Sequence, residues 1–325
     1  MNSTKRIGLV GRQFTVSGSP EDEYFRGLPA GSFDDPVLSG LLPYIGDKAV
    51  CIDVGANIGL YSLALAVLAP GGRIYAFEPS PDAFDYLQKN LAQNGAANVK
   101  VSQLALGNST GNVRFHEIPF FTAGSFTVDE SCFLTSEILG STCFEAPCTT
   151  LDEFVKSEGI DHLDLVKIDV EGGEMSVLEG ALQTIEQHHP LVVLEFSSFA
   201  LTLHQSILPQ VALERLTQIF PYIFVIGRTD GLLRRVATGN ETYDFLYDNG
   251  IYGPVDNLLC CHEDLGVTRG YIRLAAQAAE AALAAAEAQP APVAASQAPL
   301  EPSRPQRGRT LSARVLEKVS AALNR

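Results

Sequence analysis

"CIDVGANIGLYS", residues 51–62, is the stretch of sequence that decides the fold. Its opening residues are apolar and strand-forming, Gly55 and Gly59 follow, and apolar residues then recur at helical spacing. This order predicts a buried strand, a tight turn and a helix. In doubly wound sheets, the turn after the first strand lets a ligand approach the backbone closely. The stretch therefore predicts a small-molecule site at the carboxyl end of its strand.

An acid at the end of the next predicted strand narrows the class of ligand. Glu78 lies 19 residues beyond Gly59, within "AFEPS", and a carboxylate there can accept hydrogen bonds from both hydroxyls of a ribose. The loop reads GANIG and not GxGxxG, and Asp53 stands two residues before its first glycine. That carboxylate suits a cationic amino-acid group better than a pyrophosphate. These features favour S-adenosyl-L-methionine over NAD as the cofactor.

Strand-like and helix-like stretches alternate along the middle of the chain. The predicted strands are 49–55, 72–80, 99–107, 164–172 and 190–198, and the predicted helices are 60–69, 81–95, 150–159 and 174–189. Such repeated units with apolar strands argue for a parallel sheet covered on both faces. The last two strands, 222–228 and 255–262, have no good helix between them. We therefore expect an α/β fold: a Rossmann-like, doubly wound, mostly parallel sheet with an antiparallel C-terminal hairpin strand, an ending that also disfavours NAD.

Changes in composition divide the chain into five parts. We expect an N-terminal extension at 1–46, the main domain at 47–263, an Ala-rich helix at 264–289, a Pro-rich linker at 290–309 and a basic amphipathic helix at 310–325. The extension either folds over the cofactor as a lid or packs beneath it. The C-terminal helices either contact a protein partner or another copy of the chain, or end as a frayed segment on a flexible linker.

A loop-rich insertion at about 108–149, with strand-like pieces such as "NVRFHEI" at 112–118, interrupts the main domain and mixes aromatic residues with hydroxyls. It is expected either to contact the acceptor or to shield one edge of the sheet.

Charge and apolar content exclude two classes of protein. The net charge is −15; residues 265–325 hold eight Lys/Arg and four Asp/Glu, so the rest carries −19. An acidic body is a poor fit to nucleic acid, which demands clustered Lys and Arg. No apolar run approaches the roughly 18 residues of a membrane span, and "MNSTKRIGLVGRQF" lacks the apolar stretch of a secretory signal. We expect a cytoplasmic protein whose six cysteines stay reduced.

Several motifs, taken together, resemble the FkbM-type methyltransferases, a family of class I S-adenosylmethionine-dependent enzymes. The motifs are "DVGANIG" at 53–59, "FEPSP" at 77–81, "TLDEF" at 150–154, "DLVKIDVEGGEMSVLEGA" at 164–181 and "VVLEF" at 192–196. The resemblance implies S-adenosyl-L-methionine as cofactor and transfer of its methyl group to a hydroxyl of a sugar, a glycan or a natural product.

The resemblance also implies which residues contact the cofactor. The methionine and loop contacts fall on Asp53, Gly55, Ala56, Asn57 and Gly59. The ribose contact falls on Glu78, and Ala105 and Leu106 are expected near the adenine.

Methyl transfer to an aliphatic alcohol needs alignment, partial removal of water and a base. The strand period of two puts Lys167, Asp169 and Glu171 on one face of the predicted strand, Glu195 ends the next one, and His204 follows. We expect Asp169 or Glu171 to be the base or to bind the acceptor hydroxyl. Three alternatives stay open: a structural ion-pair network, a magnesium or calcium site built from Asp169, Glu171 and Glu195, and His204 as the base.

Two further functions compete with catalysis of methyl transfer. One is a non-catalytic S-adenosylmethionine-binding scaffold that is recruited through its C-terminal helix. The other is an NAD-dependent dehydrogenase.

Overall fold

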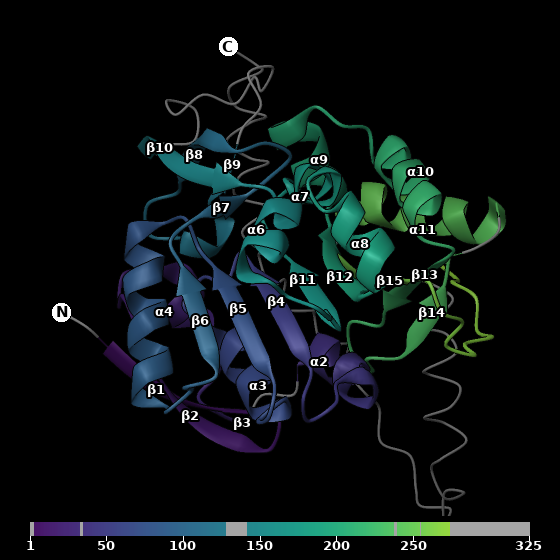
Figure 1. The fold of residues 1–325 in the computed structure, drawn as a ribbon. Coiled ribbons are helices and arrows are strands. Elements are labelled where there is room, and N and C mark those ends of the chain that lie inside the picture. The colour runs from purple at the N-terminus through teal and green to yellow at the C-terminus, as the bar shows by residue number, and fades with distance from the viewer. Residues whose placement is uncertain (1–2, 33–34, 128–141, 237–238, 254, 274–325) are drawn as a thin grey trace, which may run out of the picture. The chain divides into compact units, whose positions relative to one another are not determined.

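A computed structural model describes residues 3–32, 35–127, 142–236, 239–253 and 255–273. Cys132, the linker, the C-terminal helix and residues 274–289 of the predicted Ala-rich helix lie outside these residues. Residues 264–273, where that helix was expected to begin, are described and are not helical. Residues Met1–Tyr271 form one compact unit (Figure 1). This body extends beyond residue 263, because the Tyr271 side chain is buried against Phe245 and its backbone N–H donates to the Arg235 carbonyl.

Within the described part of the chain, the centre of the fold is an eight-stranded sheet of order β14-β13-β15-β12-β11-β4-β5-β6. The strands are β4 (Val50–Val54), β5 (Arg73–Phe77), β6 (Val99–Ser102), β11 (Leu165–Ile168), β12 (Leu191–Phe196), β13 (Tyr222–Ile226), β14 (Leu233–Arg235) and β15 (Asp256–Cys261). The five strands from β12 to β6 are parallel. β15 runs antiparallel between β12 and β13. The predicted fold class is confirmed.

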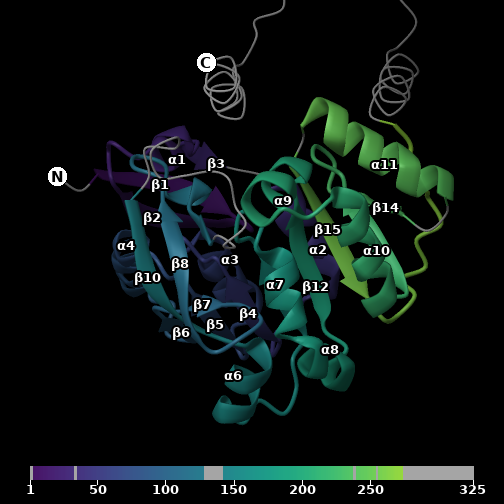
Figure 2. The ribbon, with the colours of Figure 1, turned by 90° about the horizontal axis from the view of Figure 1, so that it is seen from above.

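Helices cover both faces of this sheet because its strands are apolar on both sides. One face packs against α2 (Pro36–Leu41), α3 (Leu60–Leu68) and α4 (Pro81–Gln93). The other packs against α6 (Leu151–Glu158), α7 (Glu174–Glu179), α8 (Leu182–His188), α9 (Ser198–Gln205), α10 (Pro209–Ile219) and α11 (Gly239–Tyr252). Cys51 and Ile52 show the alternation: both are wholly buried, but on opposite faces. Figure 2 shows α10 and α11 at the end of the sheet formed by β13–β15.

The predicted helix at 174–189 is wrong as a single element, since α7 and α8 divide it. A Cβ on Gly180 would lie 2.0 Å from the carbonyl oxygen of Gly107, so the two backbones cross closely there. Asp152 then starts the second helix, because its carboxylate accepts hydrogen bonds from the N–H groups of Gln183 and Thr184.

Two other expectations about secondary structure are corrected. The predicted strand 99–107 divides into β6 and β7 (Ala105–Leu106), and β7 leaves the central sheet. It joins β8 (Gly111–Glu117), β9 (Phe126–Thr127) and β10 (Thr142–Thr149) in a small sheet. The strand-like piece predicted at 112–118 is confirmed by β8, but the described part of the insertion is more regular than the loop-rich segment that was expected. The expectation that no helix separates the last two central strands is also wrong, because α11 lies between β13 and β15 in the chain.

The N-terminal segment forms a small sheet of β1 (Ser3–Leu9), β2 (Arg12–Gly18) and β3 (Gly31–Ser32), with α1 (Glu23–Gly27) between β2 and β3. Asn90 of α4 ties this sheet to the glycine loop. Its side chain accepts from the Ser17 N–H at 2.7 Å and donates to the carbonyls of Ser17 and Ile58 at 3.0 and 2.8 Å. The segment thus packs against α4 while α1 reaches toward the ligand side. No helix among the described residues has the length and apolarity needed to cross a membrane.

Candidate active site

A cavity of about 260 Å³ opens at the carboxyl ends of the parallel strands. Its walls include these predicted residues: Asp53, Gly55, Ala56, Asn57, Glu78, Ala105, Leu106, Lys167, Asp169, Glu171 and Glu195. Gly59 and His204 are not on the wall. The structure therefore brings almost all of the predicted cofactor and catalytic residues together in one space.

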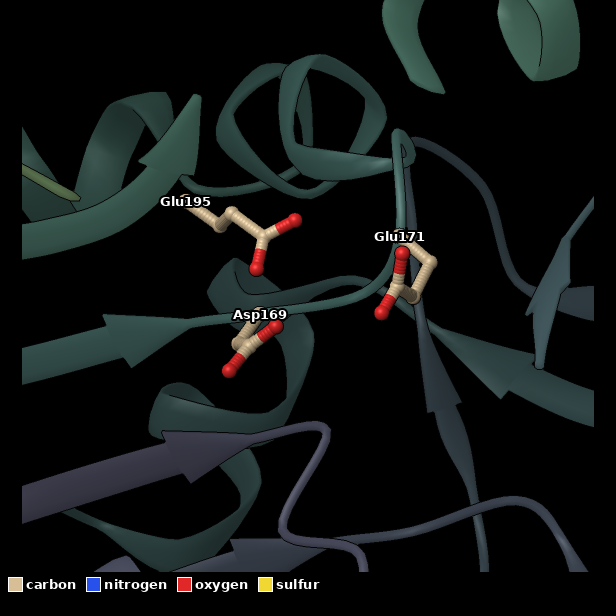
Figure 3. A group of neighbouring side chains, drawn as sticks. All are labelled: Asp169, Glu171 and Glu195. Atoms are coloured by element: carbon tan, nitrogen blue, oxygen red, sulfur yellow. The ribbon is translucent and has the colours of Figure 1, made fainter. Parts of the chain in front are cut away.

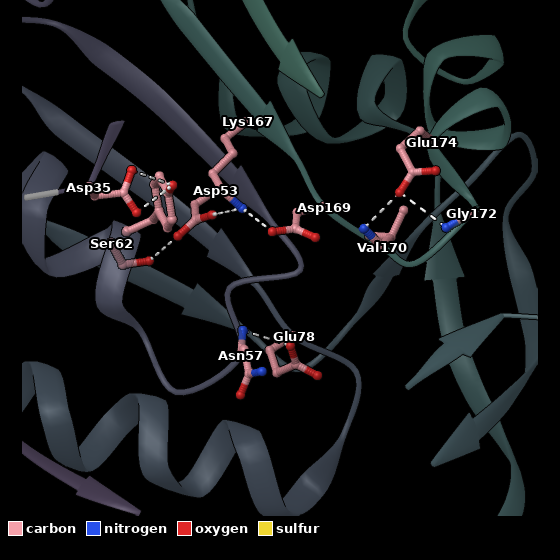
Figure 4. Close-up of polar contacts among 11 residues, drawn as sticks. Asp35, Asp53, Asn57, Ser62, Glu78, Lys167, Asp169, Val170, Gly172 and Glu174 are labelled. Carbon is pink, nitrogen blue, oxygen red and sulfur yellow. Dashed lines mark hydrogen bonds and ion pairs between the residues drawn. The ribbon is translucent and has the colours of Figure 1, made fainter. Parts of the chain in front are cut away.

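Backbone N–H groups hold the Glu78 carboxylate against the glycine loop, and Figure 4 shows it beside Asn57. One carboxylate oxygen accepts from the Asn57 N–H at 2.8 Å and the other from the Ser80 N–H at 2.9 Å. Burial raises the pKa of Glu78 to about 7, against the effect of these two hydrogen bonds, which lower it. Each oxygen keeps capacity for a further donor.

The two glycines of the loop serve the protein's own packing. Gly55 has φ +78°, and a Cβ there would lie 1.8 Å from the Asp169 carbonyl oxygen. Gly59 has φ +94°, and its Cβ would lie 2.7 Å from a methyl carbon of Leu87. The sequence predicted that a ligand would approach the backbone closely at these glycines. At Gly55 it is instead the turn containing Asp169 that approaches the glycine loop.

A buried lysine links two acids of the cavity (Figure 4). Lys167 Nζ lies 2.9 Å from Asp169 Oδ2 and 4.0 Å from Asp53 Oδ1, and it sits over the ring of Tyr61. Asp53 is wholly buried, and its Oδ2 accepts from the Ser62 hydroxyl at 2.6 Å. Burial alone lowers the pKa of Lys167, but the carboxylates of Asp169 and Asp53 outweigh it and raise that pKa. The predicted ion pair is present.

Three carboxylates converge beside this pair, as Figure 3 shows. One oxygen each from Asp169, Glu171 and Glu195 lie within 4.8 Å of one another. Glu171 does not reach this point by strand alternation, because β11 ends at Ile168 and Glu171 has φ +54° in the following turn. Burial, and next the neighbouring carboxylates, raise the pKa values of Glu171 and Glu195 well above the usual range.

Glu174 fixes that turn and was missed from the sequence. Its Oε1 accepts from the N–H groups of Val170 and Gly172 at 3.0 and 3.2 Å (Figure 4). Burial raises the pKa of Glu174 to about 7. The signal for this role was an acid at the first position of a helix, directly after two glycines, where backbone N–H groups are free.

His204 lies behind the Glu171 turn and not in the cavity, which argues against its predicted role as base. Its Nδ1 donates to the Glu171 carbonyl oxygen at 2.6 Å, and its ring stacks on Phe126 with centroids 3.7 Å apart. Burial lowers the pKa of His204 to about 4. The imidazole therefore supports the backbone of the site.

This burial predicts a pH dependence of folding. Between about pH 6.5 and 4 the unfolded chain protonates His204 and the folded chain does not, so acidification removes up to about 3 kcal/mol of stability. His204→Gln should lack that contribution, and urea unfolding of both proteins across this range measures it. His162→Gln, at an exposed histidine, is the control and should follow the wild type. If the free energy of unfolding changed with pH equally in the wild type and in His204→Gln, the lowered pKa of His204 would be contradicted.

Segments far from the motifs complete the cavity. The residues of these segments that sequence reasoning missed on its walls include Tyr24, Phe115, Thr122, Ser125 and Thr127; Tyr61, just after the glycine loop, was missed as well. Thr122 donates through its hydroxyl to Asn57 Oδ1 at 3.3 Å and through its N–H to Asp22 Oδ2 at 2.9 Å. The insertion and the N-terminal segment therefore meet at the glycine loop. The hydroxyl-rich composition of the insertion was the sequence feature that could have indicated its residues on the cavity wall.

The strand order, with antiparallel β15 beside five parallel strands and a cavity at their carboxyl ends, is that of a class I methyltransferase. Comparison with known families makes this specific, because the methyltransferase FkbM domain matches residues 53–220. The chain belongs to the FkbM methyltransferase family, as its motifs predicted.

Three curated relatives share this region. Methyltransferase sdnD of Sordaria araneosa is 32% identical over 164 residues, 43% of this chain and 62% of that protein. Hexuronic acid methyltransferase AglP of Haloferax volcanii is 28% identical over 181 residues, 56% of this chain and 69% of that protein. The 31-O-demethyl-FK506 methyltransferase FkbM of Streptomyces tacrolimicus is 28% identical over 153 residues, which are 40% of this chain and 58% of that protein. The chain thus matches about three fifths to two thirds of their lengths.

Proposed function

We propose that this protein is an S-adenosyl-L-methionine-dependent O-methyltransferase that acts on a hydroxyl of a sugar, a glycan or a natural product. The observation that carries the proposal is that Glu78 and the carboxylates of Asp169, Glu171 and Glu195 line one cavity. The names of two relatives, which refer to a hexuronic acid and to 31-O-demethyl-FK506, support transfer to a hydroxyl oxygen.

The residues present fit the proposed cofactor. Glu78 offers two oxygens, each with one backbone donor and room for another, which matches the two hydroxyls of a ribose. Asp53 offers a buried Oδ1 that lacks a hydrogen-bond donor among the described residues and suits a cationic amino group. The cofactor, when bound, supplies an electrophilic methyl group on a sulfonium.

The acidic end of the cavity is suited to hold the acceptor hydroxyl and take its proton. With the bound cofactor supplying the methyl group, a carboxylate at this end of the cavity would take the proton that the acceptor hydroxyl loses. Asp169, whose Oδ2 lies 2.9 Å from the Lys167 ammonium, is the carboxylate that we assign as the proton acceptor.

Replacing Glu78 tests the cofactor directly. Glu78→Gln keeps the shape of the side chain but turns one acceptor into a donor, so it should weaken S-adenosylhomocysteine binding by about 1.5–3 kcal/mol, roughly tenfold to hundredfold. Because the ionised form accepts both hydroxyls, wild-type affinity should fall as the pH drops through about 7, the raised pKa of Glu78. Isothermal titration calorimetry at several pH values measures both effects.

The controls separate this site from general damage. Glu158→Gln removes an acid that pairs with Lys100 on the surface and should bind S-adenosylhomocysteine as the wild type does. NAD should not bind to either protein. Preference for NAD would support the dehydrogenase, and cofactor binding without methyl transfer to any hydroxylated acceptor would support the scaffold.

A further inference from the structure

The short helix α1 is fixed at both ends, so the direction of its side chains is defined. At its start, one oxygen of Asp22 accepts from the Phe25 N–H at 2.8 Å and the other from the Thr122 N–H at 2.9 Å. At its end, the Lys5 ammonium donates to two backbone carbonyls, at 2.8 and 2.7 Å. The Phe25 ring is buried, whereas Tyr24 lies on the wall of the cavity. The N-terminal segment therefore places a phenol in the candidate active site.

The proposed cofactor carries a carboxylate as well as an ammonium on its methionine part. The ammonium suits Asp53, but the carboxylate needs hydrogen-bond donors. The glycine loop offers few, because the backbone N–H groups of residues 55–57 and 59 already donate to acceptors within the protein. The Lys167 ammonium is also engaged, since it lies 2.9 Å from Asp169 and 4.0 Å from Asp53. Side chains must therefore supply donors to the carboxylate.

Tyr24 offers a donor that the protein does not use. Of the two tyrosines on the described walls of the cavity, Tyr61 donates to Asp35 at 3.0 Å, whereas the Tyr24 hydroxyl has no hydrogen-bond partner among the described residues. Burial, and next the charge of Asp169, raise the pKa of Tyr24, so its hydroxyl keeps its proton at neutral pH. The charge of Asp53 contributes to the same rise. The phenol thus faces the part of the cavity that holds the acid proposed for the ammonium.

We propose that the Tyr24 hydroxyl donates to the carboxylate of the cofactor's methionine part, and that Asp22 positions Tyr24 for this contact. The inference rests on the proposed function, because it takes S-adenosyl-L-methionine as the ligand. Asp53 and Tyr24 would then hold the two charged groups of one amino acid. Tyr24 lies outside residues 53–220, which match the family's domain, so the N-terminal segment adds this contact to those of the family motifs.

The test compares two ligands that differ only in this carboxylate, S-adenosylhomocysteine and decarboxylated S-adenosylhomocysteine. Isothermal titration calorimetry of the full-length protein measures both affinities. Tyr24→Phe removes only the hydroxyl, so it should weaken binding of S-adenosylhomocysteine by about tenfold or more, the loss of one hydrogen bond to a charged group. Its affinity for the decarboxylated ligand should equal that of the wild type. Tyr252→Phe, at a residue of α11 that is 61% exposed, is the matched control and should bind both ligands as the wild type does.

Asp22→Asn tests the positioning role. The amide can accept only one of the two N–H groups that the carboxylate binds. The variant should therefore lose affinity for S-adenosylhomocysteine and keep its affinity for the decarboxylated ligand, whereas general damage to the site would weaken both alike.

Two results would overturn the contact: equal affinity of the wild type and Tyr24→Phe for S-adenosylhomocysteine, or an equal loss of affinity for both ligands in Tyr24→Phe. Equal losses in Asp22→Asn would overturn its positioning role. If the wild type does not bind S-adenosylhomocysteine, the proposed function fails and this contact fails with it. Failure of the contact alone is therefore distinguishable from failure of the proposed function.

Discussion

Asp169→Asn is expected to lower methyl transfer by about 10²- to 10⁴-fold, the usual contribution of a positioned acid or base. The amide cannot take the hydroxyl proton, and Lys167 loses the carboxylate that it contacts at 2.9 Å. Binding of S-adenosylhomocysteine should persist, because Glu78 and its backbone donors are unchanged. Transfer of a labelled methyl group to the best acceptor from a panel of hydroxylated compounds measures the loss, and calorimetry measures the affinity.

Asp161→Asn is the matched control, because Asp161 is exposed ahead of β11, at the end of that strand away from the cavity. It should retain wild-type turnover and affinity. If Asp169→Asn instead unfolds the protein, the ion-pair network is its main role. If the variant folds and transfers methyl groups at the wild-type rate, Asp169 is not the base.

Lys167→Met is expected to reduce the free energy of unfolding by about 3–5 kcal/mol, the cost of removing one partner from a buried ion pair. Lys167 is 3% exposed, and Asp53, which is wholly buried, would lose its nearest cation. Methionine preserves most of the volume and the contact with the Tyr61 ring, so the loss reports mainly the uncompensated charge. Urea unfolding at neutral pH measures it.

A second substitution tests that cause. Adding Asp53→Asn to Lys167→Met removes the stranded charge and should recover part of the lost stability. Lys100→Met provides the surface comparison, since Lys100 pairs with Glu158 while its side chain is 53% exposed, and should cost no more than about 1 kcal/mol. Equal losses for Lys167→Met and Lys100→Met would contradict the buried pair.

The elements with strong local signals were predicted well. β4 is apolar apart from Asp53, and α4 has a clear helical period with caps at both ends; both occur near their predicted positions. The helix at 174–189 failed because its break depends on a contact between Gly180 and Gly107, which are distant in sequence. α11 was missed because "GNETYDFLYDNGIY" is rich in glycine, asparagine and aromatic residues, which are weak helix formers.

In the candidate site, too, residues with a local sequence signal were predicted and residues placed by long-range packing were not. Glu78 and Asp169 could be placed from the sequence because each ends a strand whose position was clear. Tyr24 and Thr122 could not, because they reach the cavity from the N-terminal segment and the insertion through long-range packing. The structural role of His204 could not be predicted from the local sequence either, because only the fold shows that its ring contacts the Glu171 carbonyl and Phe126.

The position of β15 in the sheet has a consequence for synthesis of the chain. It is the last of the described strands to be made, yet it pairs with both β12 and β13. Residues 197–255 separate β12 from β15, so at about 5–20 residues per second the ribosome needs roughly 3–12 s between them. During that interval one edge of the apolar strand Leu191–Phe196 has no partner, and chaperones cover such edges in nascent proteins.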